Sequence, residues 1–584
     1  TISYAVSLLW NFIVDYRIER FDEGIISHDE TLTLAASLLE KDSVRFDVWK
    51  KYTSILVDEF QDTDDTQIRL IEALAEKDSD SQIGRLFVVG DSKQSIYGFR
   101  GAQVDSYENF VETSDLTQVP LDKSYRSSNL VLEPVNKIML ELLPSYREMQ
   151  TDRRQELPNA QLNDRVAVIG TQTSGTVDQI RRKRALDVAS SIGHYVGRTI
   201  ENREGETIST YSDIAILMRN STGVNDVIEA LQSKSIPYSV DSVDLIWEVT
   251  FTKMSLALML AISDPSDSIS IVGALKSPFF GCDNDDLIKY VDECSKLPIK
   301  RNSIWNYEEN TRKLDTKVSV ALVELSRLHR DYVSALPSTL LTELHNKSGF
   351  IDDFTSLGTS NAESISRFLL SLAVRFEESY QDRSLKDFMQ YLNAIQESGK
   401  SPITYHPSNG DVGVSLMTIH KSKGLEFPIV YVMPSIKPSN NSDIFAFDTH
   451  GSTKRTPDQI KMHINSKISS ADTSELLELK KEQISIEESR LLYVAMTRAR
   501  DFLIFCLHEE EKTSKSNEPP KGGVAMLRNA IEKSGIIEQL KPIELNLDSN
   551  SSPVDPIVVS KNDLITFESI EELQKSILIQ KTIS

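Results

Sequence analysis

Short runs of apolar, β-prone residues, several of them followed by a polar or charged residue, constrain the fold of this chain most strongly. They occupy residues 55–57, 86–89, 214–218, 414–419, 429–433 and 502–507. Because the runs show no polar–apolar alternation, they predict strands buried on both faces, as in a parallel sheet. Segments with helical spacing, such as 66–76 and 129–142, separate several of the runs. The alternation predicts an α/β protein whose ligand-binding residues lie at the carboxyl ends of the strands.

The middle of the chain has a different pattern. From residue 220 to 411 the apolar spacing is mostly helical, for example over 251–261, 318–330 and 385–396. This pattern predicts a helical insertion that splits the second of two α/β units. The expected division is a first unit over 1–120, a second over 121–219 and 412–507, the insertion over 220–411, and a linker with a peripheral tail over 508–584.

The composition excludes several classes of protein. Apolar residues make up 40% of the chain and charged residues 26%, which excludes a disordered chain. No stretch of about 18 uninterrupted apolar residues occurs, so we expect no membrane span. The scattered Cys282, Cys294 and Cys506 exclude a disulfide framework and a four-thiolate metal site, and they suit a reducing cytoplasm. The net charge of −23 argues against a protein that coats nucleic acid, although it permits a local basic groove.

An acidic block, DEFQDTD (58–64), directly follows the first apolar run. A strand that carries two adjacent acids at its tip suits a nucleotide site. One carboxylate, Asp58, can hold Mg²⁺, and its neighbour Glu59 can orient or deprotonate the attacking water. The alternative interpretation is that the two acids only begin a loop and cap the next helix.

The block VVGDSKQSIYGFRGA (88–102) contains a second strand end with further polar and aromatic residues. Gln94 can sense a γ-phosphate. Tyr97 and Phe99 lie two residues apart beside Arg100, which suits base stacking with an anchor for the backbone. Ordinary core packing of the two aromatic side chains is the alternative.

Two further regions are rich in cationic residues. The block TIHKSKGLEFP (418–428) reads as a strand, a basic turn with His420 and Gly424, and a second strand. Such a turn suits contact with a phosphate backbone, and a merely solvated loop is the alternative. The blocks YRSS (125–128) and LLYVAMTRAR (491–500) add Arg126 and Arg498.

Taken in order, these five blocks resemble motifs II to VI of the UvrD/RecB-like superfamily 1 DNA helicases. The resemblance covers residues 51–507. The sequences of TIHKSKGLEFP and of the expected strand over 213–219 resemble the RecB/AddA exonuclease subunits more closely than the shorter repair helicases. The resemblance implies an α/β fold with two RecA-like parallel-sheet motor domains. The first would be truncated at its N-terminal side, and the second would contain the helical insertion.

The resemblance also implies a role for each matching residue. Glu59 would be the hydrolytic base, Asp58 a Mg²⁺ ligand and Gln94 a contact to the γ-phosphate of ATP. Arginine fingers would be Arg126 and Arg498. The nucleotide would also meet Tyr125 at the adenine, Glu426 at the ribose and Gly424 in the same turn. Single-stranded DNA would be gripped by Tyr97, Phe99, Arg100, Thr418 and His420.

A P-loop of the form G-x-x-x-x-G-K-[ST] is missing from the chain. The most similar segment, AIQESGKS (394–401), lacks the first glycine and follows a helical pattern, so it predicts a turn that ends a helix. Nothing after residue 507 resembles a nuclease domain. We therefore expect a fragment of a motor that does not hydrolyse ATP by itself.

The predicted function is that of an ATP-dependent 3′–5′ DNA helicase or translocase, cytoplasmic, acting on single-stranded or duplex DNA in double-strand-break repair and recombination. A RecB/AddA type would imply a partner subunit similar to AddB or to RecC and RecD. Two alternatives stay open: a UvrD/Rep-like repair helicase without a nuclease, and a DNA-binding subunit that does not hydrolyse ATP.

Overall fold

The computed structural model divides into two compact units. Unit 1 comprises Thr1–Tyr125, Leu132–Arg154 and Ser439–Thr497, and unit 2 comprises Arg126–Val131, Gln155–Pro438 and Arg498–Ser584. The structure describes residues 2–75, 86–98, 104–113, 116–143, 145–151, 165–170, 172–173, 175–202, 205–296, 314–346, 349–356, 358–380, 383–398, 401–403, 405, 413–437, 445–447, 460–465, 468–469, 474–510 and 522–540.

Unit 1 contains helices and short strands from three stretches of the chain. Its first stretch holds α1 (Ile2–Asp22), α2 (His28–Leu39), α3 (Asp42–Lys51), β1 (Ile55–Val57), η1 (Phe60–Asp62), α4 (Asp65–Ala75), β2 (Leu86–Val88), η2 (Ser92–Gln94), α5 (Val104–Thr113) and β3 (Lys123–Ser124). The later stretches add β4 (Gln150–Thr151), β13 (Phe445–Phe447), β14 (Ile460–Asn465), β15 (Ile468–Ser469) and α20 (Ser474–Met496). Helix α6 (Asn129–Leu142) begins in unit 2 and continues in unit 1.

Within the residues that the structure describes, strands β1 and β2 form a parallel pair that is covered on one face only. A small core of Phe60, Ile68 and Phe110 packs against one face. On the other face Leu56 and Phe87, which are register partners, are 75% and 62% exposed. The prediction that these two strands are buried on both faces is therefore wrong for the part of unit 1 that the structure describes. The physical reason is that side chains alternate along a strand, and the described helices cover only one of the two sides.

Unit 2 is built around a six-stranded sheet in the order β10-β11-β9-β12-β16-β5, with every neighbouring pair parallel. Its strands are β5 (Val166–Ile169), β9 (Ile214–Met218), β10 (Tyr238–Val240), β11 (Val414–Thr418), β12 (Phe427–Met433) and β16 (Ala499–Cys506). Strand β9 is buried along its whole length, as its uninterrupted apolar sequence predicts. The prediction of an α/β fold with parallel sheets is confirmed.

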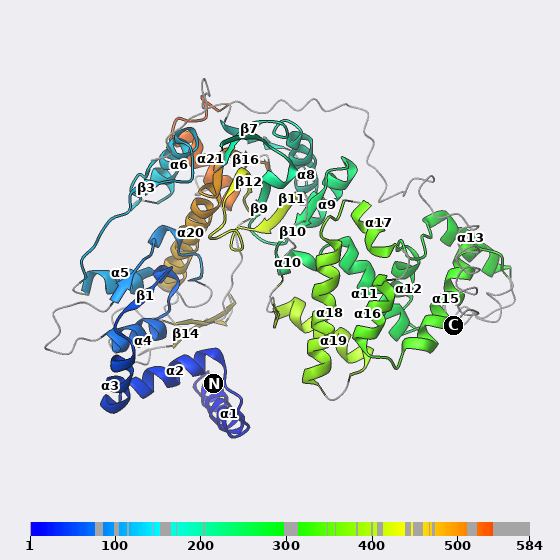
Figure 1. Ribbon diagram of the computed structural model, residues 1–584, viewed down its shortest axis with the longest axis horizontal. Coiled ribbons are helices and arrows are strands. Elements are labelled where there is room, and N and C mark those ends of the chain that lie inside the picture. The colour runs from blue at the N-terminus through cyan, green and yellow to red at the C-terminus, as the bar shows by residue number, and fades with distance from the viewer. Residues whose placement is uncertain are drawn as a thin grey trace. The chain divides into compact units, whose positions relative to one another are not determined.

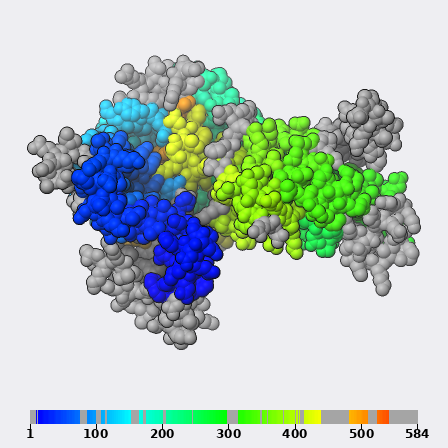
Figure 2. All heavy atoms as spheres, turned by 60° about the horizontal axis from the view of Figure 1, so that its bottom comes forward, coloured from blue at the N-terminus to red at the C-terminus, as the bar shows by residue number. Residues whose placement is uncertain are grey.

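Helices α8 (Val177–Ile192) and α9 (Val224–Ser233) pack beside this sheet (Figure 1). The chain then forms α10 (Val243–Ile246), α11 (Thr250–Ser263), α12 (Ser268–Leu275), α13 (Asn284–Ser295), α15 (Lys317–Tyr332), α16 (Pro337–Asn346), α17 (Phe350–Ser356), α18 (Ala362–Ser379) and α19 (Leu385–Ser398). These helices form one continuous green body in Figure 2. An aromatic cluster of Phe251, Phe350 and Phe354 lies in their core, with ring centroids 5.1–5.6 Å apart.

Two details of unit 2 differ from the sequence interpretation. Strand β10 lies inside the stretch expected to be helical, because Tyr238 pairs in parallel with Val414 at one edge of the sheet. His508, expected to begin a solvated linker, has no exposed surface. Strand β17 (Glu509–Glu510) then pairs with β6 (Gln172–Thr173), so the chain stays attached to unit 2 beyond β16. The five-part division of the chain itself stays a prediction.

The remaining elements of unit 2 are small. They are β7 (Thr199–Asn202), β8 (Gly205–Ile208), η4 (Tyr211–Asp213) and α21 (Gly523–Lys533). Helix α19 ends at Ser398, while Gly399 and Lys400 of the predicted turn lie outside the described residues. Among the residues that the structure describes, no helix combines the length and apolar character needed to cross a membrane.

Candidate active site

The acidic pair lies at the carboxyl end of β1, where the chain turns sharply. Asp58 and Glu59 are exposed, whereas the next residue, Phe60, is fully buried in the core of unit 1. Glu59 adopts a left-handed backbone conformation, with φ 53° and ψ 39°. That conformation costs a non-glycine residue about 1–3 kcal/mol, and it persists only where the surroundings enforce it. Here the buried side chain of Phe60 and its N–H, which donates to Val89 O at 2.9 Å, hold the turn in place.

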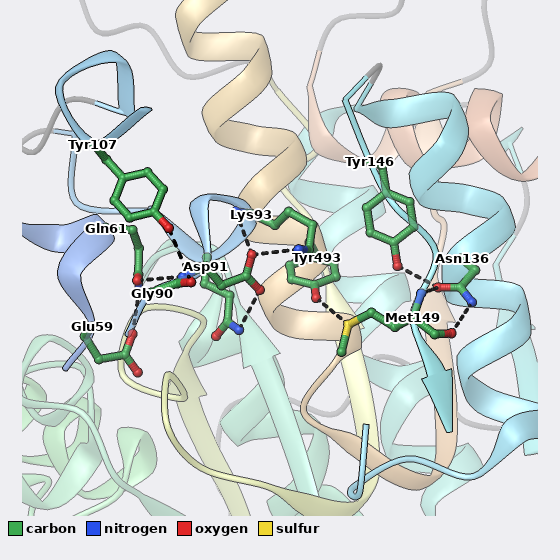
Figure 3. A network of polar contacts seen from close by, with 11 residues as sticks. Glu59, Gln61, Gly90, Asp91, Lys93, Tyr107, Asn136, Tyr146, Met149 and Tyr493 are labelled. Atoms are coloured by element: carbon green, nitrogen blue, oxygen red, sulfur yellow. Dashed lines mark hydrogen bonds and ion pairs between the residues drawn. The ribbon is translucent and has the colours of Figure 1, made fainter. Parts of the chain in front are cut away.

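Behind the acidic pair, a buried amide joins the loops after β1 and β2 (Figure 3). Gln61 is 1% exposed, and its Nε2 donates a hydrogen bond to Glu59 Oε2. Its Oε1 accepts from the backbone N–H of Asp91 at 2.9 Å. The backbone oxygen of Gln61 also accepts from Ser95 Oγ at 3.0 Å. One side chain thus connects the expected hydrolytic base to the loop that carries Gln94.

Asp91 organises that second loop. Its carboxylate accepts from the backbone N–H of Lys93 at 3.1 Å and from Gln94 Nε2 at 3.0 Å. The Lys93 ammonium lies 2.8 Å from Asp91 Oδ1. These contacts form the short helical turn η2, with Asp91 at its N-cap. The side chain of Gln94 is therefore held in one orientation at the end of β2.

Close packing at Gly90 keeps the two loops together. A Cβ at this position would lie 2.8 Å from Gln61 Oε1 and 3.1 Å from Tyr107 Cε2, so only glycine fits without a shift. The Tyr107 hydroxyl donates to Gly90 O at 3.4 Å. Burial, helped by the nearby carboxylates of Asp91 and Glu108, raises the pKa of Tyr107, so this donor stays protonated at neutral pH.

Helix α20 contacts the Gln94 loop from another side (Figure 3). The Lys93 ammonium lies 5.9 Å from the ring centroid of Tyr493, within cation–π range. The Tyr493 hydroxyl donates to Met149 Sδ at 3.0 Å, and the rings of Tyr146 and Tyr493 form a T-shaped pair with centroids 5.9 Å apart. Asn136 fixes both partners, because its Oδ1 accepts from the Tyr146 hydroxyl at 2.6 Å and its Nδ2 donates to Met149 O at 2.8 Å.

Unit 2 brings together the residues of the two arginine-containing blocks and the basic turn. Arg126 Nε lies 3.1 Å from Glu426 Oε2, although 300 residues separate them in the sequence. Ser127 Oγ donates to Ala499 O at 2.6 Å, which fixes the start of the YRSS block against β16. Both members of the Arg126–Glu426 pair are partly exposed, so the pair contributes little to stability and can open when a ligand competes.

Arg498 is far more buried than the sequence suggests, at 1% exposure. Its Nη1 donates to Leu425 O at 3.1 Å, and its backbone oxygen accepts from the N–H of Phe427 at 3.0 Å. The buried guanidinium therefore holds the backbone of the basic turn through Leu425. Gly424 in this turn has φ 82°, a conformation that glycine adopts without strain, and a Cβ added there would meet no atom within 4 Å.

The residues expected to contact DNA fall into two groups. Thr418 is 4% exposed at the end of β11, where its Oγ1 accepts from the N–H of Lys421 at 3.4 Å, and His420 is partly buried in the turn that follows. Tyr97 is partly buried after η2, while Phe99 and Arg100 lie outside the described residues. Tyr125, expected at the adenine, is 74% exposed.

The structure thus gathers Asp58, Glu59 and Gln94 in unit 1, and Arg126, Glu426, Gly424 and Arg498 in unit 2. The sequence interpretation assigned no role to Gln61, Asp91 or Tyr493, although all three stand inside the quoted blocks. Their polar side chains, directly after or beside apolar segments, were the available signal.

The residues at the tip of β1 suit a magnesium ion. Asp58 presents an exposed carboxylate, and its Oδ1 accepts a local hydrogen bond of 2.9 Å from the N–H of Glu59. Among the described residues no group of three or more His, Cys, Asp or Glu could form an all-protein metal cage. One carboxylate completed by water and phosphate oxygens is the usual way in which proteins bind Mg²⁺, and the exposed Asp58 carboxylate fits that chemistry.

Carboxylates and amides at the carboxyl ends of parallel strands are the arrangement of nucleotide-binding α/β proteins. Comparison with known families shows which nucleotide-binding α/β proteins this chain is similar to. Residues 5–115 match the UvrD/REP helicase N-terminal domain, and residues 119–510 match the UvrD-like helicase C-terminal domain. The chain therefore belongs to the UvrD-like helicase family, which confirms the resemblance seen in its five sequence blocks.

Similar proteins include several that are named as a subunit of an ATP-dependent helicase/nuclease. The one from Exiguobacterium sibiricum is 26% identical over 532 residues, which covers 86% of this chain and 44% of that protein. The one from Lactobacillus delbrueckii subsp. bulgaricus is 28% identical over 538 residues, which covers 83% of this chain and 42% of that protein. The one from Listeria monocytogenes is 26% identical over 552 residues, covering 87% and 44%. The chain spans less than half the length of these relatives.

Proposed function

We propose that the protein is the motor part of an ATP-dependent DNA helicase that translocates 3′ to 5′ along single-stranded DNA during double-strand-break repair. Membership of the UvrD-like family supports the helicase activity. The names of the relatives support a helicase/nuclease assembly. The single observation that carries the hydrolytic step is the network in which Gln61 and Asp91 join Glu59 to Gln94.

The proposed chemistry assigns one role to each of these groups. Glu59 takes the proton of the attacking water, and Gln94 binds the γ-phosphate from the end of β2. A Mg²⁺ ion bound through Asp58 would neutralise charge on the phosphate oxygens. Arg126 and Arg498 stabilise the charge that develops in the transition state, a contribution of about 10³–10⁵ in rate in other phosphoryl-transfer systems.

The Arg126–Glu426 contact supports the same assignment. Glu426 is expected at the ribose, and the 3.1 Å ion pair keeps Arg126 beside that position. Arg126 can leave Glu426 and bind a phosphate oxygen instead. This change of partner requires only that a partly exposed, weak ion pair opens.

Single-stranded DNA is the proposed track. Tyr97 and Phe99 supply stacking surfaces, with Arg100, Thr418 and His420 at the backbone. Stacking contributes about 1–3 kcal/mol per base and tolerates any sequence, as translocation requires. A partner subunit of the AddB or RecC/RecD kind and a cytoplasmic location belong to this proposal.

The test is made in the full polypeptide that the gene encodes. Glu59→Gln should lower DNA-stimulated ATP hydrolysis by about 10²–10⁴, the usual contribution of a general base, while leaving the binding of a fluorescent ATP analogue unchanged. Glu112→Gln is the matched control, because Glu112 is an exposed glutamate on α5 of the same unit. Hydrolysis that survives in Glu59→Gln would show that Glu59 is not the base.

A further inference from the structure

The amide of Gln61 has only one orientation that satisfies its surroundings. The backbone N–H of Asp91 is a donor, so the atom 2.9 Å from it must be the acceptor Oε1. Nε2 then faces Glu59 Oε2 and donates to it. The opposite orientation would set two donors against each other and an oxygen against a carboxylate. With an exposure of 1%, the side chain also has no room to leave this position without opening the core.

This orientation matters because the Glu59 carboxylate belongs to an exposed residue in a left-handed turn. A glutamate side chain has three rotatable torsions, and exposure to solvent leaves several arrangements of its oxygens within reach. A general base must lie within hydrogen-bond reach of the water that it deprotonates, and a misplacement of about 1 Å can cost about 10²-fold in rate. A buried donor that binds one carboxylate oxygen favours one arrangement of the Glu59 carboxylate over the others.

We propose that Gln61 is the positioning residue of the hydrolytic site, with each end of its amide serving a separate step. Nε2 orients the Glu59 carboxylate for proton abstraction, and Oε1 anchors the loop that presents Gln94 to the γ-phosphate. The inference rests on the proposed ATP hydrolysis and adds to it a physical connection between the base and the phosphate sensor.

The two ends can be separated by substitution. Gln61→Glu keeps an acceptor for the Asp91 N–H but sets a carboxylate oxygen against Glu59, which displaces the base. We expect kcat to fall about 10–100-fold while KM for ATP stays within about threefold. Gln61→Met has a similar length and no polar atom, so it releases both ends. In this variant kcat falls to a similar extent and KM rises as well, because the loop of Gln94 has lost its anchor.

A double-mutant cycle distinguishes positioning from a general loss of structure. In Glu59→Asp the shortened carboxylate no longer reaches Gln61 Nε2, so adding Gln61→Glu should lower kcat by less than about threefold further. Gln67→Glu is the matched control, since Gln67 Oε1 also accepts a backbone N–H, that of Asp64 at 3.1 Å, on the same unit. This control should keep the parental kcat and KM.

Circular dichroism and thermal melting of each variant show whether it is folded. If Gln61→Glu does not fold, the neutral Gln61→Met carries the test through its kcat. A folded Gln61 variant with parental kcat overturns the inference, and so does a full additional loss in the Glu59→Asp background. If Glu59→Gln is inactive and the Gln61 variants are not, this inference alone fails. If Glu59→Gln remains active, the proposed hydrolytic site is wrong.

Discussion

Replacement of Gly170 by alanine should destabilise unit 2 far more than the same change at Gly197. Gly170 follows β5 with φ 93°, and a Cβ there would lie 2.6 Å from Cγ of the His508 ring and closer still to Nδ1 and Cε1. His508 has no exposed surface, and its Nε2 lies 2.7 Å from Asp187 Oδ2. Gly197 also has a positive φ, 84°, but no atom within 4 Å of the added Cβ.

The expected magnitudes follow from these two environments. A left-handed backbone costs alanine about 1–2 kcal/mol, partly offset by about 0.4–1 kcal/mol from the stiffer unfolded chain. Gly197→Ala should therefore lower the free energy of unfolding by about 1 kcal/mol. Gly170→Ala adds overpacking of about 1–3 kcal/mol and a broken buried hydrogen bond of about 1–3 kcal/mol. Gly170→Ala should therefore lower the free energy of unfolding by about 3–7 kcal/mol in total.

Urea unfolding of the 584-residue chain measures both values. Fluorescence of Trp247, which is 5% exposed in unit 2, reports on the transition of that unit once Trp10, Trp49 and Trp305 are replaced by phenylalanine in every variant. The m-value should stay constant, so that a shifted midpoint reports stability rather than a changed unfolded state. If the two variants differ by less than about 0.5 kcal/mol, His508 does not occupy the space in front of Gly170 and the reasoning fails.

Two further outcomes follow from buried titratable groups. Burial lowers the pKa of His345 from 6.5 to about 4, so the unfolded state binds more protons between those values and the free energy of unfolding falls as pH decreases from 6.5 to 4. We expect His345 to lower the free energy of unfolding by about 3 kcal/mol between pH 6.5 and pH 4. Urea unfolding of His345→Gln should show a weaker pH dependence of this free energy. Burial also raises the pKa of Cys282 and Cys506 to about 12, so a thiol reagent at pH 8 should react rapidly with Cys294 only. Rapid reaction of more than one thiol per chain would contradict the burial of Cys282 or Cys506.

The sequence predicted four of the six strands of the unit 2 sheet, together with several helices, because their signals are local. The apolar run over 214–218 became β9, and the helical spacing over 129–142 became α6. Strands β5 and β10 were missed, since they are four and three residues long and gain their hydrogen bonds from β16 and β11, which lie far away in the sequence. A short strand whose partner is remote carries no periodicity of its own to detect.

At the site, the residue types were predictable and their partners were not. The blocks placed Glu59 and Gln94 at strand ends, but the buried Gln61 amide between them depends on the parallel pairing of β1 with β2. The left-handed conformation of Glu59 has no sequence signal, because glutamate rarely adopts it. Likewise, the burial of Arg498 depends on its contact with Leu425, which is made only when β12 and β16 pair.

The order of strands in the unit 2 sheet also governs how the protein can be made. Strand β5 lies at one edge of that sheet and pairs with β16, and the partners Val166 and Leu503 are about 340 residues apart. At about 5–20 residues per second of synthesis, the ribosome needs about 15–70 s to produce that partner. During this time the apolar β5 lacks its native neighbour, whereas the helices between α11 and α19 can already pack locally. Nascent chains of this protein should therefore depend on chaperones until β16 emerges, and slower translation of the helical region would prolong that exposure.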